Sequence, residues 1–97
     1  MNRRVSFRPE AEAETLEARD WYEGRQRGLG AAFRAALDGT LEHVAENPLL
    51  YRCVRGETRR AILDRFPYAV YFRMVDDDIV VLAVHGRQHE RRWQKRS

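Results

Sequence analysis

Residues 59–92 constrain the fold most, because they contain three consecutive segments with the pattern of antiparallel strands. The expected strands cover residues 59–65, 68–75 and 79–85, and the three aspartates at 76–78 are typical of a hairpin loop. Positions 79–84 are all apolar, which indicates a central strand covered on both faces. The stretch ends in arginines and histidines, so the predicted sheet carries groups suited to an anionic target at one edge.

The first half of the chain predicts one short strand and two helices. Residues 4–8 alternate polar and apolar side chains and stop at Pro9, a residue favoured in a first helical turn. A helix is expected from residue 10 to about 27, and its glutamates are expected to lie in solvent: Glu10, Glu12, Glu14 and Glu17. Its apolar positions near helical spacing are Ala13, Leu16, Trp21 and Tyr22.

The second helix is expected from the glycine break at residues 28–30 to about residue 46. Apolar side chains recur there at helical spacing: Leu29, Phe33, Ala36, Leu37, Leu41 and Val44. Asn47-Pro48 ends the pattern, because a residue before proline is disfavoured in a helix. A further strand region is expected at residues 51–55, followed by a turn at Gly56-Glu57.

The order of these elements predicts an α+β fold. Two helices joined by a short glycine turn pack as an antiparallel hairpin, and their shared apolar face requires a sheet to cover. We therefore expect the order β-α-α-β-β-β, with the helical hairpin packed on a small antiparallel sheet. The 97 residues suit one domain, spanning residues 1–97.

Composition limits the function classes. The single cysteine, Cys53, excludes an intrachain disulfide and a four-cysteine zinc site. With 34% charged residues, little apolar surface remains for a deep small-molecule pocket, and we expect no cofactor and no metal site. No apolar run approaches the length that spans a bilayer and no leader pattern is present, so a cytoplasmic protein without a membrane partner is expected.

Charge divides the chain into an acidic part and a basic part. Residues 9–47 hold nine acids and four arginines, whereas residues 48–97 hold eleven basic residues and six acids. Arginines beside an aromatic ring can clamp phosphates and stack on bases, and the basic run at residues 85–96 includes Trp93. A solvated basic tail explains the same run equally well.

His85 is the histidine at the end of a predicted core strand. A histidine there suits proton transfer, but a purely structural role is the preferred interpretation of this position. Arg59 and Arg60 are neighbours on a predicted strand, so they point to opposite faces and at most one of them serves a given site.

Several short motifs together resemble the ParE/RelE superfamily of type II toxin–antitoxin toxins, in its ParE-like plasmid-stabilisation branch. The resemblance covers nearly the whole chain and rests on the order of these motifs: Trp21-Tyr22, the GLGAAF turn into Phe33, Asn47-Pro48 before Tyr51, Arg59-Arg60, Phe66-Pro67-Tyr68, and Val84-His85 followed by Arg87, Trp93 and Arg96. The β-α-α-β-β-β order is the fold of that superfamily.

The resemblance implies a bacterial toxin that a small antitoxin neutralises in a toxin–antitoxin hetero-oligomer. Two target classes divide the superfamily. ParE-like members inhibit DNA gyrase without an accepted nuclease site, whereas RelE-like members cut messenger RNA on the ribosome. This chain has only Lys95 as a lysine and no tyrosine after Tyr71, and both features depart from the RelE-like pattern. Gyrase inhibition is therefore the leading expectation.

The expected target-binding residues are Arg59, Arg60, Arg87, Arg91, Arg92, Trp93 and Arg96. The alternative is a ribosome-dependent endoribonuclease, with His85 as general acid or base and with Arg60 and Arg87 stabilising the phosphate charge. That alternative would make the protein an enzyme. A third possibility is a non-catalytic binding module of the same fold.

Overall fold

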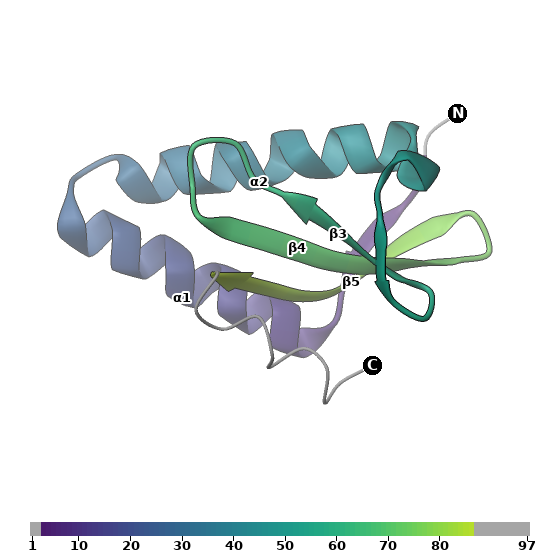
Figure 1. The fold of residues 1–97 in the computed structure, drawn as a ribbon. Coiled ribbons are helices and arrows are strands. Elements are labelled where there is room, and N and C mark those ends of the chain that lie inside the picture. The colour runs from purple at the N-terminus through teal and green to yellow at the C-terminus, as the bar shows by residue number, and fades with distance from the viewer. Residues whose placement is uncertain (1–2, 87–97) are drawn as a thin grey trace.

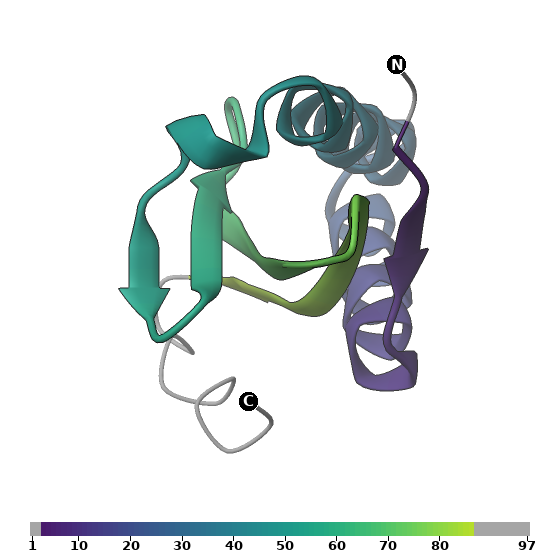
Figure 2. The same cartoon turned by 90° about the vertical axis from the view of Figure 1, so that its right-hand side faces the viewer.

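The computed structural model describes residues 3–86, which form two long helices beside a five-stranded sheet (Figure 1). In chain order the elements are β1 (Val5–Phe7), α1 (Pro9–Arg25), α2 (Leu29–Glu46), the 3-10 helix η1 (Pro48–Leu50), β2 (Cys53–Arg55), β3 (Thr58–Ile62), β4 (Tyr68–Val75) and β5 (Asp78–Gly86). Seen from the side, α1 and α2 lie together on one side of a strongly curved sheet (Figure 2). The predicted α+β class and the helical hairpin on the sheet are confirmed.

The sheet has the strand order β1-β5-β4-β3-β2, so β5 lies inside it as expected. The region predicted at residues 51–65 forms β2 and β3, separated by the expected turn, in which Gly56 adopts a φ of 54°; the order β-α-α-β-β-β counted these two strands as one. The antiparallel sheet that was predicted is in fact mixed, because β1 runs parallel to β5 while the other pairs are antiparallel. A parallel pair of strands requires a long connection between them. The segment between β1 and β5 contains both helices, so it is long enough for the two strands to run in the same direction.

The inner face of α2 matches its apolar pattern, but that of α1 does not. Phe33, Leu37, Leu41 and Val44 of α2 are buried as predicted. In α1 the buried residues are Ala11, Thr15, Ala18 and Tyr22, whereas Leu16 is 43% exposed and Trp21 is 54% exposed. The predicted inner face of the first helix was therefore wrong except at Tyr22. Small residues line most of the true face because α1 lies close to β5.

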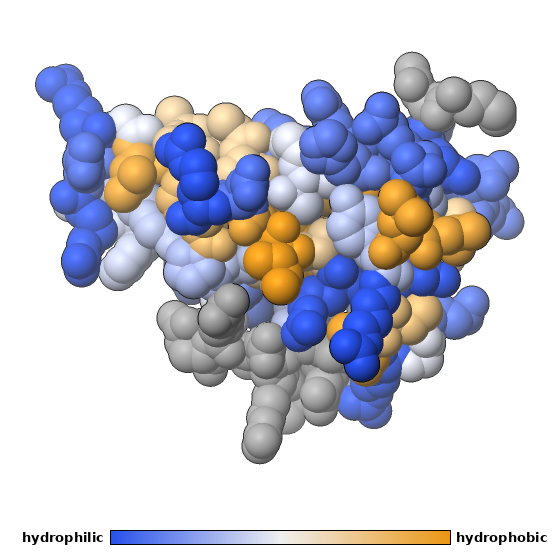
Figure 3. All heavy atoms as spheres, turned by 45° about the horizontal axis from the view of Figure 1, so that its top comes forward, coloured by the Kyte–Doolittle hydropathy of each residue, from blue (hydrophilic) through white to orange (hydrophobic). Residues whose placement is uncertain are grey.

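The outer surface of the molecule is mainly hydrophilic. On the face drawn in Figure 3, apolar side chains gather in patches separated by hydrophilic ones. The most exposed large apolar side chains of residues 3–86 are Leu49 and Leu50 in η1, at 72% and 80% exposure. Neither α1 nor α2, the long helices of this range, is apolar enough over its length to cross a membrane.

Candidate functional site at the end of strand β5

One face of the sheet turns away from the helices, and it carries His85. Ala69, Tyr71 and Ala83 form a small buried cluster there, separate from the core that the helices share with the sheet. His85 pairs with Ala69 and Arg60 pairs with Tyr71, and directly paired residues share a face of a sheet. We call these five residues the open face: Arg60, Ala69, Tyr71, Ala83 and His85. The name is used because they lie on the side of the sheet away from the helical core, although all of them except Arg60 are themselves buried.

A bulge in β5 places His85 on the open face. Tyr71 pairs with Ala83 but the next residue of β4, Phe72, pairs with Val81, so Leu82 is an extra residue in β5. Val81 belongs to the core beneath the helices. Strict alternation from Val81 would direct His85 into that same core. The extra residue reverses the alternation and turns the imidazole toward the other side.

Glu14 of α1 binds the end of β5 with both carboxylate oxygens. Its Oε2 lies 2.5 Å from His85 Nε2. Its Oε1 accepts a hydrogen bond from the backbone N–H of Val84 at 3.0 Å. The His85 side chain is 2% exposed and the Glu14 side chain is 14% exposed, so the contact lies within the protein. Together these groups join the first helix to the last strand.

The surroundings of His85 indicate which ring nitrogen carries a proton. Nε2 faces the Glu14 carboxylate, which accepts hydrogen bonds, whereas Nδ1 is buried without a hydrogen-bond partner within the described range. A neutral His85 therefore carries its proton on Nε2. The Tyr71 ring lies beside it, with ring centroids 6.0 Å apart and planes inclined by 56°.

Comparison with known proteins identifies the family. The family model described as "ParE toxin of type II toxin-antitoxin system, parDE" matches residues 5–92. The chain belongs to the ParE toxin family. The fold agrees with this: a chain from the chromosomal ParDE TA system from P. aeruginosa superposes with a TM-score of 0.64 at 17% identity, covering 87% of this chain and 95% of that one. No curated protein matches the sequence significantly.

The structure separates the site residues predicted for this ParE-family toxin. Arg59 pairs with Phe72 on the helix side of the sheet, and its Nη1 donates to the backbone carbonyl of Tyr51 at 2.6 Å. Arg60 lies on the open face with His85, and the two arginines point to opposite faces as expected. The remaining predicted residues lie outside the described residues: Arg87, Arg91, Arg92, Trp93 and Arg96.

Glu14 is the residue that sequence reasoning missed in this ParE-family chain. It was expected in solvent with the other glutamates of α1, and that expectation was wrong because its carboxylate reaches β5. A signal was present in the spacing. Glu14 lies three residues after Ala11 and four before Ala18, so it borders the buried face of α1.

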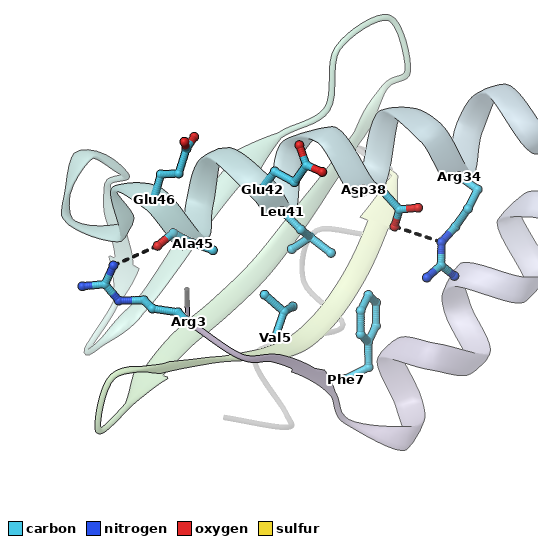
Figure 4. Close-up of a pocket in the computed structure, with 9 residues that line it drawn as sticks. All are labelled: Arg3, Val5, Phe7, Arg34, Asp38, Leu41, Glu42, Ala45 and Glu46. Carbon is cyan, nitrogen blue, oxygen red and sulfur yellow. Dashed lines mark hydrogen bonds and ion pairs between the residues drawn. The ribbon is translucent and has the colours of Figure 1, made fainter. Parts of the chain in front are cut away.

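The toxin also has an open cleft of about 690 Å³ between β1 and α2 (Figure 4). Val5, Phe7 and Leu41 line its apolar part. Arg3 bridges one end by donating to the Ala45 carbonyl at 2.8 Å. Near the other end, Arg34 binds Asp38 at 3.1 Å. None of the predicted site residues that the structure describes lines this cleft.

Proposed function

We propose that this ParE-family toxin inhibits DNA gyrase by binding it, without catalysing a reaction itself, and that it does so in the cytoplasm. The observation that carries the proposal is the family match over residues 5–92. The burial of His85 supports a non-enzymatic mode of action, because a general acid or base must reach its substrate. The basic residues at 87–96 are the proposed gyrase-binding segment.

We further propose that a cognate antitoxin neutralises the toxin in a hetero-oligomer. The family description names a toxin–antitoxin system. Charge supports a partner with an acidic segment, since residues 48–97 contain eleven basic residues and six acids. An acidic segment would be attracted to that part of the chain, and the attraction would weaken as salt is added.

Purified toxin without antitoxin should inhibit the supercoiling of relaxed plasmid by gyrase, or cause gyrase-dependent breaks in the plasmid. A triple variant, Arg87→Ala with Arg91→Ala and Arg92→Ala, should lose this effect. A matched variant removes the same charge from exposed positions elsewhere, at Arg19, Arg27 and Arg55, and should keep it. Unchanged supercoiling and intact plasmid with the unaltered toxin would refute gyrase inhibition.

One observation favours a second candidate function, a ribosome-dependent endoribonuclease. A carboxylate that binds an imidazole is the arrangement that orients a histidine for general acid–base catalysis, and Glu14 and His85 have that arrangement. Induced expression without antitoxin separates the two candidates. Early DNA damage with intact protein synthesis supports gyrase inhibition, whereas early arrest of translation with cut messages supports the nuclease. A His85→Ala chain as toxic as the parent would count against the nuclease.

A further inference from the structure

Within residues 3–86, the last part of β5 has a strand neighbour on one side only. β1 pairs with β5 at Ile79, Val80 and Val81, and the N–H of Arg8 then binds the Val81 carbonyl. Pro9 follows and begins α1, so the first strand cannot continue along β5. Beyond this point the Val84 N–H faces outward from the sheet and donates to Glu14. Helix α1 thus supplies an acceptor at a place where no strand of the described residues pairs with β5.

His85 fixes the carboxylate in that place. An unbound glutamate side chain has several rotatable bonds. Fixing them costs conformational entropy, and this cost weakens a contact that the side chain makes at one point only. The His85 ring, packed beside Tyr71 and 2% exposed, offers a rigid donor 2.5 Å from the second oxygen. The carboxylate is thereby held at two points on neighbouring residues of one strand.

We infer that Glu14, His85 and the Val84 N–H form a clasp that positions the end of β5 for toxin activity, and that His85 acts there as a positioning residue. The inference rests on the proposed function. Gly86 pairs with Tyr68 and ends β5, and the chain continues directly to Arg87, the first residue of the proposed gyrase-binding segment. Without the clasp, the strand end at Gly86, from which that segment continues, would be less firmly held.

Two substitutions separate this role from proton transfer. The side-chain amide nitrogen of glutamine occupies the region of histidine Nε2, whereas that of asparagine reaches only the region of Nδ1. His85→Gln can donate to Glu14 and should keep gyrase inhibition within about twofold. His85→Asn cannot reach Glu14 and should lose about tenfold or more in potency. The free-energy cost of a buried polar group without its partner corresponds to a factor of about that size. Neither side chain can act as a general acid or base.

Amide hydrogen exchange at Val84 gives a readout that does not depend on gyrase. The clasp predicts slow exchange in the unaltered chain and in His85→Gln, and faster exchange by about tenfold in His85→Asn and Glu14→Ala. Glu12→Ala is the matched control, because Glu12 is exposed on the same helix and should change neither exchange nor potency. Thermal unfolding of each variant shows whether the chain is still folded.

Each pattern of results decides the inference. Equal potency in His85→Gln and His85→Asn, whether both are active or both inactive, would overturn it, and inactivity of both folded variants would indicate a need for the imidazole itself. If His85→Asn does not fold while His85→Gln does, the clasp is supported. The potency of Glu14→Ala against gyrase then shows whether the clasp is needed for activity. If the unaltered toxin leaves gyrase unaffected, the proposed function fails, while the exchange at Val84 still tests the clasp.

Discussion

At the scale of single residues, Gly30 decides how closely the two helices approach where they join. A Cβ atom at this position would lie 2.7 Å from the backbone oxygen of Arg19 and 3.0 Å from the Glu23 side chain. The Glu23 carboxylate accepts hydrogen bonds from the N–H groups of Gly28 and Gly30 at the start of α2. It therefore satisfies donors that a helix start leaves unpaired, and its negative charge suits that end of the helix dipole.

Gly30→Ala should lower the free energy of unfolding by about 1–3 kcal/mol, because the added methyl group overpacks the helix contact. Gly39→Ala is the control within the same helix. Nothing lies within 4 Å of a Cβ at Gly39, so alanine there should stabilise the chain by up to about 1 kcal/mol through helix propensity. Urea unfolding followed by circular dichroism measures both. Equal effects of the two substitutions would show that the close contact at Gly30 is not the cause.

At the scale of elements, an aromatic cluster holds the helical hairpin against β4. Tyr22 of α1 stacks on Phe33 of α2 with ring centroids 5.3 Å apart, and both rings contact Phe66 and Tyr68 edge-on. Burial raises the pKa of Tyr22 above its ordinary value, and the nearby Tyr68 adds to this rise. Burial also raises the pKa of Tyr68, with a further contribution from the charge of Glu17.

These shifts predict loss of stability at alkaline pH. The folded chain holds the two phenolic protons to higher pH than the unfolded chain does, so their stabilising effect is complete below about pH 10, the ordinary tyrosine value. It is lost as the pH rises through the raised values of the folded state. The thermal unfolding midpoint should therefore fall above about pH 10, and less steeply in Tyr68→Phe. A midpoint with the same pH dependence in both chains would contradict this account.

At the scale of the whole molecule, both helices and the sheet share one core. Ala11, Phe33, Ala61, Val70 and Val84 come from α1, α2, β3, β4 and β5 and belong to one buried cluster. Because this cluster joins all layers of the fold, we expect the described part of the chain to unfold in one cooperative transition.

Phe33→Ala should lower the free energy of unfolding by about 3–5 kcal/mol, since a fully buried aromatic ring is replaced by a cavity. Leu49→Ala removes a side chain that is 72% exposed and should change stability by less than about 0.5 kcal/mol. Urea unfolding followed by both circular dichroism and tryptophan fluorescence tests the size of the effect and the cooperativity. Separate transitions by the two probes would argue against a single shared core.

The agreement between sequence and structure was best where a pattern was local and strong. The apolar spacing of α2 from Phe33 to Val44 predicted its buried face, because one strongly apolar stripe on a helix has only one stable orientation. Helix α1 lacked such a stripe: its buried positions at Ala11, Thr15 and Ala18 are small or polar, and Trp21 lies on the surface. The spacing of apolar residues could not identify the buried face of α1, because that face is selected by its close approach to β5.

The sequence by itself determined the order of the elements, the helical hairpin, the α+β class and the resemblance to the ParE/RelE superfamily, since these depend on local periodicity, turn residues and motif order. Tertiary structure alone decided that β1 runs parallel to β5, that a bulge turns His85 to the open face, and that Glu14 meets it there. The physical reason is distance along the chain. Glu14 and His85 are 71 residues apart, and their contact depends on how α1 crosses the end of β5, which no local pattern specifies.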